Sequence, residues 1–174
     1  FQAFINNPGV EKYNAVVVHT PDGKNPNNLT DDEGKTFIVD AEKIADESDK
    51  MPLKKAIETA EKINTDNLTL SFGNFFKETL KEAKSAFADN NTSKSKVAKC
   101  IKSLKWAIKR SEISALMFEK EALDSKSATF DKNKWQAVED AYKAAKRYLM
   151  TIDISDTKVQ KVIKDLQVAL KDLN

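Results

Sequence analysis

Histidine and cysteine, two residue types often used in acid–base and nucleophilic catalysis, are scarce in this chain, and those present have structural explanations. His19 is the only histidine and Cys100 the only cysteine. No nucleophile motif accompanies His19, which we interpret as a surface or strand-end residue. Cys100 shares a helical apolar stripe with Val97 and Leu104, so we expect a small buried hydrophobe and not a reactive thiol. A single cysteine also excludes an intrachain disulfide and a cysteine-based zinc site.

The acidic residues suggest a metal site at one place only. Asp31, Asp32 and Glu33 precede Gly34, but the alternating ligands of an EF-hand loop are absent, and we interpret the segment as a solvated acidic loop. Carboxylate pairs could in principle hydrolyse glycosides, yet each acidic residue in a predicted helix has an ordinary surface explanation. The sequence therefore predicts no catalytic residue, no metal and no cofactor.

A run of basic residues is the first feature that suggests binding. No acidic residue lies between Ser93 and Ser111. This set can meet a polyanion such as an acidic glycan, or it can be a solvated face paired with Glu58, Glu61, Glu78 and Glu82 on neighbouring helices. The basic residues are Lys94, Lys96, Lys99, Lys102, Lys105, Lys109 and Arg110.

Trp106 is the second feature, because it follows Val97 by nine positions and so falls opposite the apolar stripe at 100° per residue. We expect that it is not a core residue of its own bundle. The candidate interaction face comprises Lys99, Lys102, Trp106 and Lys109. Two readings stay open: a ligand platform, or a docking point for the apolar side chains of residues 1–50.

These residues are positioned by a sequence unit that occurs twice. When the chain is shifted by 62 positions, from Val97 to Val159, apolar residues fall on apolar residues without a gap. The shift predicts two units, residues 51–112 and 113–174. The matched pairs include Phe76 with Val138, Leu80 with Tyr142, Ala83 with Ala145, Cys100 with Val162, Ile101 with Ile163, and Leu104 with Leu166.

Apolar spacing of i, i+3, i+4 and i+7 predicts three helices in each unit. In the first unit we expect helices over residues 52–64 and 71–88 and from Ser93 onward, with Pro52 in a first turn. Ser93, Asp131 and Ser155 are the expected N-caps. Since residues 109–124 contain no Gly or Pro, one continuous helix from Ser93 to Leu123 is predicted to join the units.

Residues 1–50 have a different pattern. Short strands are expected over residues 15–19 and 36–39, separated by a turn-forming segment. Two short strands cannot form a core of their own, so this segment is expected to pack on the helices, to belong to a preceding β-domain or to remain partly mobile, and we favour packing. The predicted fold class is all-α: two three-helix bundles in tandem, preceded by an N-terminal segment of loops and short strands.

Trp, Val, Ala and aromatic residues follow one another in a fixed order in the second unit: Trp135, Val138, Ala141, Tyr142, Ala145, Val159, Val162, Ile163, Leu166, Ala169, Leu170 and Leu173. In this order the second unit resembles the FIVAR repeat. The first unit resembles the same repeat, although Gly73 occupies the position of Trp135 and Phe72 and Phe75 adjoin it.

The resemblance implies a non-catalytic spacer or interaction module of a larger secreted or cell-surface protein of Gram-positive bacteria, such as a glycan-degrading enzyme or an adhesin. Expected partners are neighbouring domains, another protein or an acidic glycan. The alternative function is a carbohydrate-binding module that uses an exposed aromatic and basic face. A net charge of +2 does not indicate nucleic acid, and no apolar run approaches the roughly 20 residues of a membrane span.

Overall fold

The structure, a computed structural model, describes residues 43–173. This part of the chain is all-helical, as the sequence predicted. The strands expected at residues 15–19 and 36–39 lie outside it. The α-helices are α2 (Glu47–Ala60), α3 (Leu70–Ala88), α4 (Lys94–Leu123), α5 (Lys132–Leu149) and α6 (Asp156–Lys171), and short 3₁₀ helices are formed by η1 (Thr65–Asn67) and η2 (Asp124–Thr129).

Helix α2 begins at Glu47 and ends at Ala60, so the start predicted at Pro52 is wrong. Asp46 accepts a hydrogen bond from the backbone N–H of Asp49, and the Asp49 side chain accepts one from the backbone N–H of Asp46. This reciprocal capping box satisfies two N–H groups at the helix start. Pro52 consequently lies inside the helix, where it has no N–H to donate to the preceding turn.

Helix α4 is continuous over 30 residues, which confirms the predicted joining helix. Ser93 is its N-cap and accepts a hydrogen bond from the backbone N–H of Lys96. At 1.5 Å per residue, a helix of this length extends about 45 Å. The boundary predicted between residues 112 and 113 therefore falls within a single helix.

The shift found in the sequence also relates the observed helices. Helix α3 covers residues 70–88 and α5 covers 132–149, while α4 begins at residue 94 and α6 at 156. Asp131 and Ser155 cap α5 and α6 through their side chains, as predicted. The first helix of the second unit is the C-terminal part of α4 itself.

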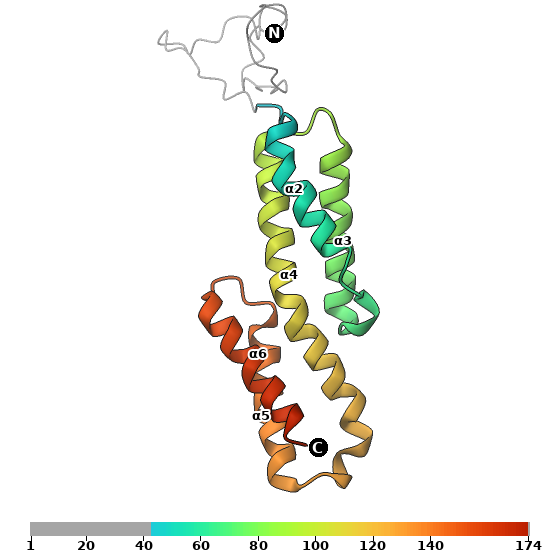
Figure 1. The fold of residues 1–174 in the computed structure, drawn as a ribbon, viewed down its shortest axis with the longest axis vertical. Helices are drawn as coiled ribbons and strands as arrows, with labels where there is room; N and C mark the ends of the chain where they lie inside the picture. Colours follow the sequence, from blue (N-terminus) through green and yellow to red (C-terminus); the bar gives the residue numbers. More distant parts are fainter. Residues whose placement is uncertain (1–42, 174) are drawn as a thin grey trace, which may run out of the picture.

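The helices pack in two groups that share α4. Helices α2 and α3 contact α4 and each other, as do α5 and α6. Figure 1 shows an elongated arrangement in which α2 and α3 lie along the N-terminal half of α4, and α5 and α6 along its C-terminal half. The largest wholly buried apolar side chains are Leu53, Phe72, Phe76, Val97 and Leu104 in the first group, and Ile113, Val138, Val159 and Leu166 in the second.

Two buried rows on α4 explain how one helix serves both groups. In each row the intervals alternate between three and four residues, the spacing that keeps a row facing one partner along a helix. The first row ends at Ser114, whose side chain forms hydrogen bonds with Thr69 at the start of α3. The second row reaches Lys120, which pairs with Glu139 of α5. The rows are Val97, Cys100, Leu104, Ala107, Ser111 and Ser114, and Arg110, Ile113, Met117 and Lys120.

Candidate interaction surface

The predicted interaction face lies on the N-terminal half of α4. Lys99, Lys102 and Lys109 are exposed, and Trp106 is half-buried. At 100° per residue these four residues fall within about 80° of one another around the helix axis. They therefore lie on one face of α4.

Trp106 contacts side chains of both α3 and α4. Its ring meets Phe75 of α3 edge-on, with the ring centroids 5.8 Å apart. The Arg110 guanidinium lies over the Trp106 ring at 5.1 Å from its centroid. Trp106 is not among the buried core residues, but it packs against them as a partly buried side chain in contact with Phe75. A ring covered in this way offers little open surface for stacking a sugar.

Arg110 links this face to the second group of helices, and sequence reasoning placed it only among the basic residues. It is 2% exposed, and its Nη2 donates a hydrogen bond to the backbone oxygen of Thr151, between α5 and α6. Burial lowers the pKa of Arg110, although nearby Asp156 opposes that effect. Its position four residues after Trp106, on the same helix face, was the available signal.

Two buried donors beside this link have no hydrogen-bond partner among the described residues. They are Nε1 of Trp106 and Nε of Arg110. Buried N–H groups are normally satisfied by protein or by ordered water. The junction between the two groups thus combines tight ring contacts with unsatisfied hydrogen-bonding capacity.

Few of the basic residues on α4 form ion pairs. Lys94 pairs with Asp49 at 3.2 Å and Lys109 with Asp156 at 2.8 Å. This second pair holds the pKa of Asp156 below its usual value, through the hydrogen bond from Lys109 and its charge. Lys99, Lys102 and Lys105 have no ion pair with any described carboxylate within 4.0 Å.

The acidic partners expected for these lysines do not pair with α4. Glu61 of the α2–α3 connection pairs with Lys84 at 2.6 Å, and Glu78 with Lys81 at 3.7 Å within α3. Neither Glu58 nor Glu82 forms an ion pair with a described lysine. Lys96, Lys99, Lys102 and Lys105 are therefore exposed and have no ion pair with a described carboxylate.

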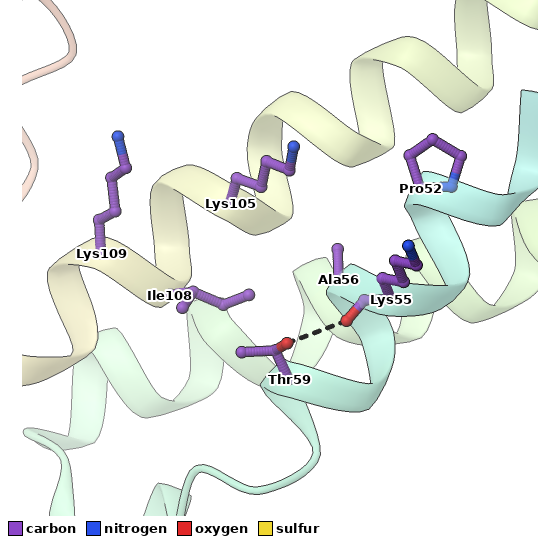
Figure 2. Close-up of a pocket in the computed structure, with 7 residues that line it drawn as sticks. All are labelled: Pro52, Lys55, Ala56, Thr59, Lys105, Ile108 and Lys109. Atoms are coloured by element: carbon purple, nitrogen blue, oxygen red, sulfur yellow. Dashed lines mark hydrogen bonds between the residues drawn. The ribbon is translucent and has the colours of Figure 1, made fainter.

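A shallow groove of about 320 Å³ lies between α2 and α4. Figure 2 shows Lys105 and Lys109 of α4 extending to one side, with Lys55 and Pro52 across from them on α2. Ala56, Ile108 and Thr59 form the space between the two helices. The sequence alone does not reveal this groove, because it forms only where side chains of α2 and α4 pack side by side.

The residue types that could perform chemistry have structural roles in the part of the chain that the structure describes. Cys100 is buried, and burial together with the Glu82 charge raises the pKa of its thiol, which disfavours the reactive thiolate. Within residues 43–173 no three His, Cys, Asp or Glu side chains come together as a metal site, and no helix is long and apolar enough to cross a membrane. His19 and the Asp31–Glu33 segment lie outside these residues.

A buried lysine in the second group was not anticipated. Lys120 Nζ lies 2.7 Å from Asp124 Oδ1 and 2.8 Å from Glu139 Oε1. It also lies over the rings of Tyr142 and Trp135. Burial lowers the pKa of Lys120, but the hydrogen bonds and charges of Asp124 and Glu139 raise it above the ordinary value overall. The ammonium is therefore a fixed positive charge within the packing of α4 on α5.

Comparisons with family models, curated proteins and solved structures give no match to this chain.

Proposed function

We propose that this chain is a rigid, non-catalytic spacer and interaction module made of two tandem three-helix bundles. The observation that carries the proposal is α4, which contributes to the packing of both helix groups without interruption. A spacer needs a fixed separation between its ends. A shared helix provides this more directly than a flexible linker, because bending it requires breaking backbone hydrogen bonds.

The engagement of reactive side chains supports a structural role. Cys100 packs in the first group, Lys120 is held by Asp124 and Glu139, and Tyr142 donates its hydroxyl to Glu121. Each of these three side chains has a packing or pairing partner. The tandem repeat and its resemblance to FIVAR sequences further support a module of a larger secreted or cell-surface protein, with neighbouring domains as its first partners.

The alternative is a carbohydrate-binding module that stacks a sugar ring on Trp106. Such a site requires an exposed aromatic face beside polar groups. The contacts of Trp106 with Phe75 and Arg110 favour the spacer over this alternative. The uncompensated lysines of α4 nevertheless leave an attractive surface for an anionic partner.

Limited trypsin digestion of the full chain tests the rigidity of the spacer. Trypsin cleaves after Lys and Arg, and the middle of α4 contains Lys105, Lys109 and Arg110. Because cleavage requires local opening, we expect a stable product that retains an intact α4. Early cleavage after Lys109 or Arg110, at a temperature where the helical signal is unchanged, would contradict the proposal.

A further inference from the structure

We propose that the groove between α2 and α4 binds one sugar unit of a linear acidic polysaccharide, an inference that rests on the interaction role of the module. Residues of two helices, α2 and α4, line the groove. Its lining combines the side chains of three lysines, the aliphatic surface of Pro52, Ala56 and Ile108, and Thr59 (Figure 2). Its volume of about 320 Å³ suits a small unit.

The charge of the groove favours an anion. Lys55 of α2 and Lys105 of α4 line it from different helices, and neither has an ion pair with a described carboxylate. Lys109 forms an ion pair with Asp156. No acidic side chain is among the described residues that line the groove, and the carboxylate paired with a lining residue is Asp156. An anionic group between Lys55 and Lys105 would thus gain two charge-assisted contacts.

The aliphatic floor of the groove and the Thr59 hydroxyl limit the chemical class of the ligand. Pro52, Ala56 and Ile108 offer aliphatic surface, against which the C–H face of a sugar ring can pack. Thr59 Oγ1 donates its proton to the Lys55 backbone oxygen at 2.9 Å, so it is left as an acceptor for a ligand hydroxyl. A sugar acid carries an anionic group, hydroxyl donors and an aliphatic face together, whereas inorganic phosphate lacks the last two.

A polymer fits better than a single sugar because the positive charge continues beyond the groove. Lys102 and Lys99 follow Lys105 toward the N-terminus of α4, and both are exposed and have no described ion pair. At 100° and 1.5 Å per residue, Lys102 lies about 60° around the axis from Lys105, and Lys99 lies about 120° around it and about 9 Å along it. A polymer that curves around α4 from the groove can therefore place its next anionic unit at Lys102, which strengthens an individually weak site.

The test is titration of the full chain with polygalacturonate oligomers, monitored by calorimetry. Neutral dextran and double-stranded DNA of similar length serve as comparison ligands. The site variant is Lys55→Gln with Lys105→Gln. The matched control is Lys81→Gln with Lys143→Gln, which removes the same charge from exposed positions on α3 and α5. A third variant, Thr59→Val, removes the hydroxyl while keeping its shape.

We expect the site variant to bind the acidic oligomer about tenfold more weakly or worse, with less than about twofold loss in the control, because only the first loses charge-assisted contacts. Thr59→Val should weaken binding without changing its salt dependence. Equal losses in the two lysine variants, absence of binding, or tighter binding of DNA through the same lysines would each overturn the proposal. None of these results would bear on the trypsin resistance of α4.

Discussion

Individual polar side chains in the packed regions set where the helices meet. Lys120 is the clearest example, because its ammonium is buried beside two carboxylates and two aromatic rings. Buried charges are tolerated when they are paired, and they destabilise strongly when one partner is removed. The Lys120 cluster therefore predicts two measurable effects.

Replacing Lys120 by Met should lower the free energy of unfolding by roughly 1–3 kcal/mol. This is less than the 3–5 kcal/mol typical of fully buried pairs, because Asp124 and Glu139 retain access to water. Chemical denaturation measures the difference. The control, Lys143→Met, alters an exposed lysine and should stay within about 0.5 kcal/mol of the parent. Equal effects would show that Lys120 is not held as described.

Tyr142 predicts a loss of stability in alkaline solution. Burial and the hydrogen bond to Glu121 raise the pKa of Tyr142 to about 12. The unfolded chain releases this proton near pH 10, so the stabilisation is complete below pH 10 and is lost as pH rises toward 12. Tyr142→Phe should lose less stability over this range in denaturation at several pH values. A parallel loss in parent and variant would contradict the assignment.

The hydrogen bonds of Ser114 are expected to stabilise the contact between α3 and α4. It is fully buried, accepts a hydrogen bond from the Thr69 backbone N–H and shares another with the Thr69 hydroxyl, both at 3.0 Å. Ser114→Ala leaves that N–H buried and unsatisfied, which costs about 1–3 kcal/mol. Thermal or chemical unfolding should show this loss. The exposed Ser85→Ala serves as control, and a neutral Ser114→Ala would indicate that another group satisfies Thr69.

At the scale of secondary structure, α4 is the element on which both helix groups depend. Glu112 is exposed at its centre, so its side chain can be changed with little effect on packing. A proline there removes a backbone hydrogen bond and clashes with the preceding turn, at a cost of about 3 kcal/mol or more. We expect Glu112→Pro to lose at least that much stability in denaturant unfolding, while Glu112→Ala remains near the parent. A mild effect of the proline would mean that the groups are separate domains.

Much of this helical arrangement could be predicted from the sequence because it depends on local signals. The N-caps Ser93, Asp131 and Ser155 and the lack of Gly and Pro in residues 109–124 are local, and the 62-residue shift shows that the same local pattern occurs twice. The start of α2 was misplaced because Pro52 was given more weight than the capping box of Asp46 and Asp49. Both are N-terminal signals, and the hydrogen-bonded pair determined the start.

The candidate site was less predictable because it depends on contacts between helices. A helical wheel places Trp106 correctly on α4, but it cannot show that Phe75 of α3 reaches its ring. Burial of Arg110 and Lys120 requires the acceptors Thr151 and Glu139, which lie on distant parts of the chain. The groove between α2 and α4 likewise exists only once the two helices pack.

At the scale of the whole molecule, the described residues form an elongated body whose length follows α4 (Figure 1). Each helix group buries its own apolar side chains, and Arg110 connects the junction to the α5–α6 segment. This arrangement favours a fixed separation between the two groups. Such a fixed separation is the central claim of the spacer proposal.

Pulsed electron paramagnetic resonance between spin labels on the two groups measures this separation most directly. The labels would be attached to Lys81→Cys on α3 and Lys164→Cys on α6, both exposed positions, in a Cys100→Ala background. Preserved helical signal and unfolding temperature would establish that the labelled chain is folded. We predict a single narrow distance distribution that stays unchanged with salt and temperature below unfolding. A broad distribution, or two populations, would show that the groups move independently and would contradict the rigid spacer.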